Sequence, residues 1–246
     1  MIHLITYGDN KYSKSKQRLY NQAYNTGWFD TMRQVSLYGP EDLDNDFKDK
    51  FKNILQHDRG GGYWIWKPYI IKKHLDKIKE NDILIYLDSG CTINPHGKER
   101  LNEYIEMLNQ SDEGCISFQM DHRENIYTIK EIFQHFNIEQ DGILANTGQL
   151  IGSIQIIKKN LNSIKLVNLW NETLYDNNLL FTDYYNKTQN SYFKDNRHDQ
   201  SIFSIIRKMY NPILLKDETY FATGFGGEES LKYPFWATRI SDLYIY

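Results

Sequence analysis

Cysteine is nearly absent from this chain, which has only Cys91 and Cys115 among 246 residues. Two thiols cannot form the disulfide framework of a small secreted domain, and they have no metal-site spacing. Long apolar runs are also missing: nothing approaches the ~20 residues that a transmembrane helix needs. The N-terminal segment lacks the basic and apolar stretches of a signal peptide. We therefore expect a cytoplasmic protein without a transmembrane segment.

An excess of positive charge is also absent. The chain carries 29 Lys and Arg against 32 Asp and Glu, a net charge of −3. Non-specific binding to nucleic acid relies on a basic face, so we expect no nucleic-acid partner. Aromatic residues are abundant at 15% of the chain, with 19 Tyr and 5 Trp. Their rings suit stacking on carbohydrates or bases, although many will form core.

The chain is long enough for one domain with a substantial core, and no linker divides residues 1–246. Continuous apolar runs at Ile2–Tyr7 and Ile83–Leu87 predict strands buried on both faces. Segments with helical spacing alternate with strand-like runs. This alternation predicts an α/β fold, Rossmann-like, with a mixed but mainly parallel sheet and helices on both faces.

Local patterns refine this prediction at four places. Pro40 can occupy the first turn of an acidic helix that runs to about His57. Gly60–Gly62 forces a sharp bend or a close approach. The pattern Thr-x-x-Glu that begins at Thr128 predicts a capping box. Residues 176–197, rich in Asn, Asp and Tyr, predict a surface loop.

The run Ile83–Leu87 ends in Asp88-Ser89-Gly90. In open α/β sheets, ligands bind beyond the carboxyl ends of the strands. Asp88 is therefore the first candidate for a group that faces a ligand. The alternative is that Asp88 only caps a turn or the next helix.

Together, three segments resemble a known family. Gly60–Pro68, followed by a helix and then Tyr86–Gly90, resembles the donor half of a GT-A-fold nucleotide-sugar glycosyltransferase. The similarity is to the small type found in large DNA viruses and bacterial polysaccharide loci. Arg197–Gln200 resembles the His-Asp-Gln element at the acceptor side of the sugar in these enzymes. The motifs occur in the family's order over most of the chain.

The resemblance implies a hexosyltransferase of polysaccharide biosynthesis. Its donor would be a nucleotide diphosphate sugar, expected to be UDP-linked, and its acceptor a glycan or another hydroxyl compound. The donor-binding half would span about residues 1–120 and the acceptor-side half about 121–246 of one glycosyltransferase domain. The sugar, the acceptor, the stereochemical course and the oligomeric state are left open.

Negative charge builds on the leaving diphosphate, so a metal ion, Lys or Arg, or helix N-termini must offset it. The family places a basic residue at the position of Lys67, which could otherwise be a solvated surface amine. Lys16 and Arg18 could reach a phosphate or simply form an exposed helix face. The donor-binding residues expected are Thr6, Tyr7, Lys16, Arg18, Trp66, Lys67, Asp88, Ser89, Gly90 and Gln149.

Within that set, Thr6 and Tyr7 would meet the base or ribose from the end of the first strand. Trp66 would stack on the donor or belong to the core. Gln149 resembles a residue on the strand that the family uses beside the sugar.

Asp199 is the best candidate for a catalytic carboxylate. It precedes a helix, whose N-terminus favours a negative charge. In an inverting reaction Asp199 could be the base that takes the acceptor proton. In a retaining reaction Asp199 or Gln200 would lie near the anomeric carbon. His198 could hydrogen-bond behind them, and Asp199 could alternatively be only a helix cap.

A divalent cation is also implied, with one departure from the family. GT-A enzymes usually carry Asp-x-Asp at the strand end, but here the second position is Gly90. The late family segment that often holds a His ligand corresponds to residues 232–236, which contain none. One carboxylate with diphosphate oxygens and waters can still hold Mg²⁺. We therefore expect Mn²⁺ or Mg²⁺ at Asp88, without a firm requirement for it.

Two other functions compete with the transferase. A sugar-1-phosphate nucleotidyltransferase usually has a glycine-rich loop with Arg and Lys after its first strand, and residues 8–11 are too poor in glycine. A non-catalytic carbohydrate-binding or interaction module would use the aromatic residues for glycan and Asp88 only as a cap.

Overall fold

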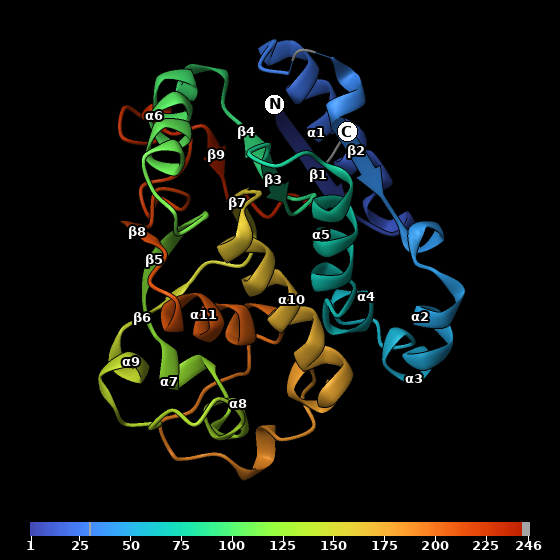
Figure 1. The fold of residues 1–246 in the computed structure, drawn as a ribbon, viewed down its shortest axis with the longest axis vertical. Helices are drawn as coiled ribbons and strands as arrows, with labels where there is room; N and C mark the ends of the chain where they lie inside the picture. Colours follow the sequence, from blue (N-terminus) through green and yellow to red (C-terminus); the bar gives the residue numbers. More distant parts are fainter. Residues whose placement is uncertain (30, 243–246) are drawn as a thin grey trace.

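The computed structural model describes residues 1–29 and 31–242. A seven-stranded sheet with the order β2-β1-β3-β7-β5-β6 forms its centre, and β8 pairs with β5. A two-stranded sheet of β4 and β9 lies apart from it (Figure 1). The strands are β1 (Ile2–Tyr7), β2 (Val35–Tyr38), β3 (Ile83–Leu87), β4 (Thr92–Ile93), β5 (Cys115–Arg123), β6 (Gly148–Leu150), β7 (Ile154–Lys158), β8 (Ile213–Lys216) and β9 (Phe235–Trp236).

The mixed α/β sheet is confirmed, but the prediction that it is mainly parallel is wrong. Strand β1 runs parallel to β2 and β3, and β8 runs parallel to β5. The pairs β3–β7, β7–β5 and β5–β6 are antiparallel, so among the described strands of this sheet antiparallel pairs are as many as parallel ones. The separate pair β4–β9 is antiparallel as well. The reason is β7, which lies between β3 and β5 and runs opposite to both. Strands β6 and β7 both run opposite to β5, and only residues 151–153 separate them in the chain.

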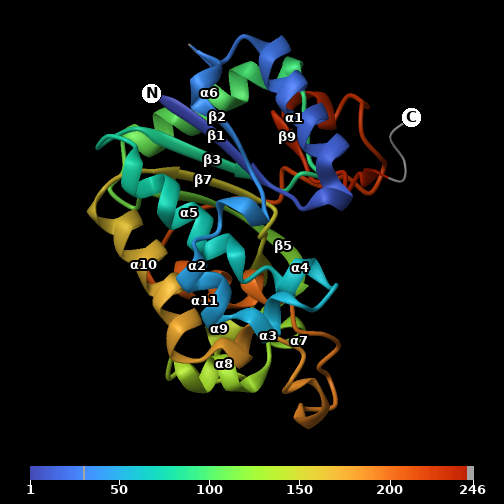
Figure 2. The ribbon, with the colours of Figure 1, turned by 90° about the vertical axis from the view of Figure 1, so that its right-hand side faces the viewer.

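Helices cover both faces of the large sheet (Figure 2). One face packs against α5, α10 and α11, the other against α1 and α6. The helices are α1 (Ser13–Thr26), α2 (Asn45–Lys50), α3 (Lys52–Leu55), α4 (Gly60–Tyr63), α5 (Trp66–Lys77), α6 (Lys98–Asn109), α7 (Glu124–Tyr127), α8 (Lys130–His135), α9 (Ile143–Asn146), α10 (Leu161–Asp176) and α11 (Asp199–Met209).

Strand β3 joins the two cores. Its side chains alternate between them: Leu84 and Tyr86 belong to the core beneath α5 and α10, while Ile83, Ile85 and Leu87 belong to the other. All five are buried. The apolar run of β3 is continuous because both faces of the strand are buried, as the sequence predicts.

The acidic helix predicted from Pro40 to His57 is not continuous. A short 3₁₀ turn at Pro40–Asp42 is followed by α2 and α3, which are separated at Phe51. The Phe51 ring is buried and lies 4.9 Å from the Phe47 ring, centroid to centroid. The chain therefore bends where it places both rings in the core.

The predicted capping box at Thr128 is also wrong. Helix α8 begins at Lys130, and its N-cap residue Ile129 makes no side-chain cap. The Thr128 hydroxyl instead donates to the Glu124 carboxylate at 2.7 Å. The segment 176–197 carries 3₁₀ turns at Asn178–Phe181 and Asn186–Thr188 and is only partly a surface loop.

None of the helices in the described ranges is both long and apolar enough to cross a bilayer.

The contact between α10 and α11 offers a test of the core. The rings of Trp170 and Phe203 stack at 4.0 Å between centroids, and both side chains are buried. Trp170→Ala should lower the free energy of unfolding by about 3–5 kcal/mol, because it leaves a large cavity. Urea denaturation measures this loss. Leu161→Ala, at a side chain 83% exposed, is the control and should change stability by less than about 0.5 kcal/mol. Equal effects of the two substitutions would contradict the packing.

Candidate functional site

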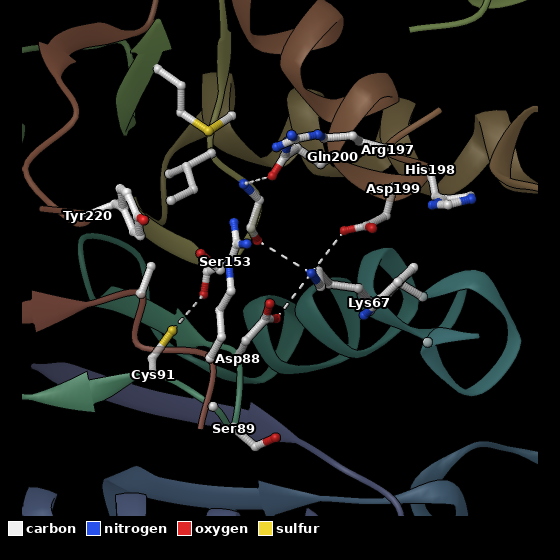
Figure 3. A pocket seen from close by; sticks show the side chains of 18 of the residues that line it. Lys67, Asp88, Ser89, Cys91, Ser153, Arg197, His198, Asp199, Gln200 and Tyr220 are labelled. Carbon is white, nitrogen blue, oxygen red and sulfur yellow. Dashed lines mark hydrogen bonds and ion pairs between the residues drawn. The ribbon is translucent and has the colours of Figure 1, made fainter. Parts of the chain in front are cut away.

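A cleft of about 1380 Å³ opens where β1 and β3 end. Its walls come from the ends of these strands, the glycine-rich turn, the β6–β7 loop, residues 195–200 and the segment after β8 (Figure 3). This is the edge at which α/β sheets bind ligands.

Lys67 connects two carboxylates in this cleft. Its ammonium nitrogen lies 3.1 Å from Asp88 Oδ1 and 2.9 Å from Asp199 Oδ2, as Figure 3 shows. It also donates to the Gly152 carbonyl oxygen at 3.4 Å. The Lys67 side chain is only 3% exposed, so it is not a solvated surface amine. Residues 67, 88 and 199, far apart in sequence, therefore form one charged cluster.

Burial and pairing set the protonation of this cluster. Burial alone would lower the pKa of Lys67, but the carboxylates of Asp199 and Asp88 outweigh it and raise the pKa to about 12. Burial raises the pKa of Asp199 to about 6, although the Lys67 charge opposes this rise. Lys67 is thus a permanent cation, whereas Asp199 can accept and release a proton near neutral pH.

Asp88 has a second partner from its own strand. The buried Tyr86 hydroxyl donates to Asp88 Oδ1 at 2.6 Å. The Asp88 backbone N–H donates to the Ser153 carbonyl oxygen at 2.8 Å, which joins the end of β3 to the β6–β7 loop. No helix begins directly after Asp88, since β4 follows. The carboxylate is turned toward Lys67, so the helix-cap alternative does not describe it.

His198 holds the backbone from which Asp199 projects. Its φ of +54° is rare for a residue with a side chain, and such strain is found where surrounding contacts enforce it. The ring Nε2 lies 2.7 Å from Asp183 Oδ1, and Arg59 donates to the other oxygen of Asp183 at 2.8 Å. Burial lowers the pKa of His198 despite Asp183. These contacts fix the start of α11 against the glycine-rich turn.

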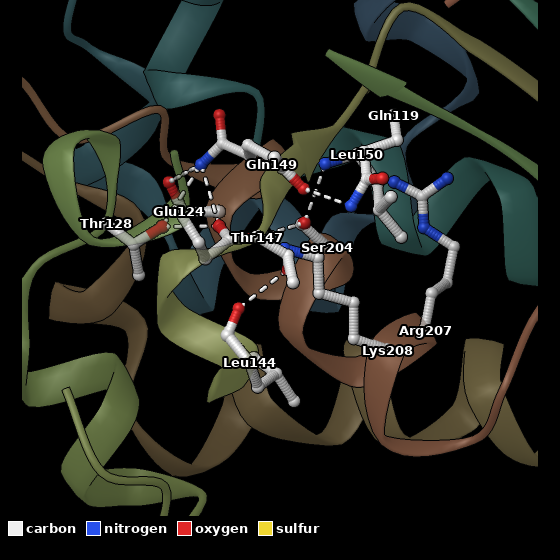
Figure 4. A network of polar contacts seen from close by, with 12 residues as sticks. Gln119, Glu124, Thr128, Leu144, Thr147, Gln149, Leu150, Ser204, Arg207 and Lys208 are labelled. Atoms are coloured by element: carbon white, nitrogen blue, oxygen red, sulfur yellow. Dashed lines mark hydrogen bonds and ion pairs between the residues drawn. The ribbon is translucent and has the colours of Figure 1, made fainter. Parts of the chain in front are cut away.

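Gln200 lines the cleft and contacts a polar network around Gln149 and Glu124. Figure 4 shows this network. Gln200 Oε1 accepts the Gly152 N–H at 2.8 Å, and its Nε2 donates to Gln149 Oε1 at 2.6 Å. Gln149 Nε2 donates in turn to Glu124 Oε1 at 2.9 Å. Glu124 is fully buried and pairs with Lys208 at 2.7 Å. Gln149 is therefore placed behind Gln200 and is not among the residues that line the cleft.

The glycine-rich segment is a left-handed turn. Every residue from Gly60 to Trp64 has a positive φ. A Cβ at Gly62 would lie 2.8 Å from the Leu55 Cα, which explains a glycine there. The Trp66 ring stacks on Tyr7 at 3.8 Å, and its indole N–H donates to the Gly60 carbonyl oxygen at 3.0 Å. Tyr7 and Trp66 line the cleft and brace this turn.

Besides Gln149, three predicted donor residues are not among those that line the cleft: Thr6, Lys16 and Arg18. Lys16 donates to the Tyr38 carbonyl oxygen at 3.1 Å. Arg18 donates to the carbonyl oxygens of Ser89 and Cys91 at 3.1 and 2.6 Å. Arg18 thus holds the backbone after Asp88, while a phosphate contact of these residues stays a prediction.

A search of family models and a search of curated protein sequences found no match to the chain. Among solved structures, it resembles a glycosyltransferase involved in the glycosylation of the major capsid of PBCV-1, with a TM-score of 0.53 and 9% identity over 96% of this chain and 92% of that one. The chain has the GT-A fold.

Two further solved structures resemble the chain more weakly, and both are glycosyltransferases. Mouse xyloside xylosyltransferase 1 gives a TM-score of 0.45 at 11% identity, covering 96% of this chain and 97% of that one. The galactosyltransferase LgtC, in complex with donor and acceptor sugar analogues, gives 0.45 at 10% identity, covering 90% and 75%.

GT-A enzymes often use a divalent cation, but the residues of this cleft do not fit one. A Cβ at Gly90 would lie 2.9 Å from the Ile240 carbonyl oxygen, so a second carboxylate has no room. Asp88 Oδ1 already contacts an ammonium and a hydroxyl. In the described ranges, no group of three or more His, Cys, Asp or Glu is arranged to hold a metal. This is not the oxygen-rich ligand set that Mn²⁺ or Mg²⁺ prefers.

Arg197 and Arg239 are among the cleft residues that the sequence-based donor and catalytic sets do not contain. Arg197 directly precedes the His-Asp-Gln element, so its position in the sequence could have identified it as a cleft residue. Arg239 lies in the C-terminal segment, where nothing in the local sequence connects it with Gly90.

The raised pKa of Asp199 predicts a pH effect on stability. The folded state binds a proton near pH 6, whereas an unfolded carboxyl binds it near pH 4, so this contribution grows as pH falls through that window. As the pH is lowered from 8 to 4, the wild-type free energy of unfolding should rise by about 2 kcal/mol relative to that of Asp199→Asn. Parallel urea titrations measure the difference. A difference that is constant across this range would contradict the assignment.

Proposed function

We propose that this chain is a glycosyltransferase that moves a hexose from a nucleotide diphosphate sugar, expected to be UDP-linked, to a hydroxyl of a glycan or similar acceptor. One observation carries the proposal: Lys67 joins the strand-end Asp88 to Asp199 of the His-Asp-Gln element inside one cleft. A fold alone does not imply an activity, but this arrangement of charges supplies the groups that the reaction needs.

In this proposal the donor lies along the ends of β1 and β3. Tyr7 and Trp66 flank the nucleoside, and Asp88 with Ser89 meets the ribose. Residues 1–120 then form most of the donor-binding half, and residues 121–246 most of the acceptor side, of one glycosyltransferase domain.

Asp199 serves the acceptor. With a pKa near 6, Asp199 takes the proton of the attacking hydroxyl. The buried Lys67 cation favours the ionised carboxylate, so Asp199 can release this proton again afterwards. Gln200 has its amide held by Gly152 and Gln149, so it presents a fixed polar group beside the sugar. Preorganised polar groups of this kind stabilise charge in the transition state.

A thermal-shift panel tests the function. The protein is heated with UDP, GDP, CMP, dTDP or UTP in a buffer that contains Mn²⁺, because a ligand of the folded state raises the melting temperature by mass action. A diphosphate-selective rise, largest for UDP, is expected. A triphosphate-selective rise indicates a nucleotidyltransferase. No rise with any nucleotide indicates a binding module and contradicts the proposal.

The role of Asp199 has a separate test. Asp199→Asn should reduce donor hydrolysis and transfer by about 10²–10⁴-fold, because it removes the proton acceptor while keeping the shape of the side chain. Asp112→Asn, at a position outside the cleft lining, is the control and should keep wild-type activity. Product formation is measured by chromatography, and melting curves verify folding. A variant at position 199 that retains half of the wild-type rate would exclude Asp199 as the base.

A further inference from the structure

The C-terminal segment occupies the place where a second metal-binding carboxylate would stand. The Ile240 N–H and the Thr238 hydroxyl both donate to the Gly90 carbonyl oxygen, at 3.0 and 2.7 Å. A Cβ at Gly90 would lie 3.2 Å from the Arg239 Cα. The residue two positions after Asp88 is thus covered by backbone, and the residue that covers it is an arginine.

This segment is anchored on both sides of Arg239. Before it, β9 pairs with β4. After it, the Asp242 carboxylate accepts the backbone N–H and the hydroxyl of Ser15, both at 2.6 Å. Arg239 itself has a φ of +56°, a conformation that residues with side chains rarely adopt. The contacts on both sides hold the Arg239 backbone at the cleft in spite of this cost.

A second arginine, Arg197, lines the same cleft. Arg197 lies next to His198 and Asp199, and its guanidinium packs over the Tyr127 ring at 4.2 Å. In the described part of the chain, Arg59 and Arg100 are ion-paired with carboxylates, whereas no ion pair joins Arg197 or Arg239 to one. Burial lowers the pKa of Arg197, and the nearby positive charge of Arg239 lowers it further. Asp195 also acts on Arg197 through its charge, but without an ion pair. Two like charges that line one cleft, neither of them ion-paired with a carboxylate, favour a bound anion.

We infer that Arg197 and Arg239 bind the diphosphate of the donor and take the place of the divalent cation. The inference rests on the proposed function and names the residues that stabilise the negative charge of the leaving diphosphate. Two guanidinium ions supply the same charge as one Mn²⁺, and their planar forks match phosphate oxygens. The bond from the anomeric carbon to the diphosphate oxygen breaks, and its electron pair stays on that oxygen beside the two arginines. The acceptor oxygen bonds to the anomeric carbon, and its proton passes to Asp199.

Calorimetric titration of the full chain with UDP, in excess EDTA and in excess Mn²⁺, tests the inference. UDP should bind in EDTA with an affinity within about twofold of that in Mn²⁺, since no bound metal contributes to it. Arg197→Gln and Arg239→Gln should each weaken UDP binding by about tenfold or more, the usual loss for a charge-assisted contact, and leave uridine binding almost unchanged. Arg239→Lys keeps the charge but not the fork and should bind UDP with intermediate affinity.

Arg33→Gln removes the same charge from an exposed position outside the cleft and is the matched control. It should bind UDP as the wild type does. Melting curves of all variants verify folding, and Arg239, whose side chain is exposed, should tolerate substitution.

The outcomes separate the inference from the proposed function. UDP binding that requires Mn²⁺ would overturn the inference and leave the transferase proposal standing. The same holds if UDP binds in EDTA but both glutamine variants bind it as well as Arg33→Gln does. Failure of UDP, GDP, CMP and dTDP to bind under either condition would overturn both.

Discussion

The candidate site depends on one buried cation that neutralises two carboxylates. Without Lys67, Asp199 would be an unpaired charge in the interior and Asp88 would lose its main partner. Burying an unpaired charge costs far more than burying a paired one. The arrangement of β3, α5 and α11 must therefore keep the Lys67 ammonium within ion-pair distance of both carboxylates. This requirement constrains the geometry of the cleft.

The antiparallel strand β7 makes this arrangement possible. It enters the sheet between β3 and β5, so the turn that precedes it lies beside the end of β3. This turn supplies the Ser153 carbonyl oxygen to the Asp88 N–H and the Gly152 carbonyl oxygen to Lys67. Gly152 also donates to Gln200, so the turn connects the strand-end carboxylate with the start of α11. A parallel strand at this position would place its beginning at the other edge of the sheet.

The sequence predicted the parts of the fold and site that have local signals. Continuous apolar runs identified β1 and β3, and the polar residues after β3 identified Asp88. Lys67 and Asp199 were chosen by their motifs, and the structure brings them together. The direction of β7 and the break at Phe51 were not predictable, because both depend on tertiary packing that no local pattern records. Arg239 and the network behind Gln149 were missed for the same reason: their partners lie far away in the sequence.

The most direct test is the pKa of Asp199 itself, measured by NMR titration of its carboxyl carbon in the wild type and in Lys67→Met. The account predicts a midpoint near pH 6 in the wild type and a clearly higher midpoint once the neighbouring cation is gone, because burial and the Asp88 charge then raise the pKa without that opposing charge. An ordinary aspartate midpoint near pH 4 that does not respond to the loss of Lys67 would contradict the existence of the cluster.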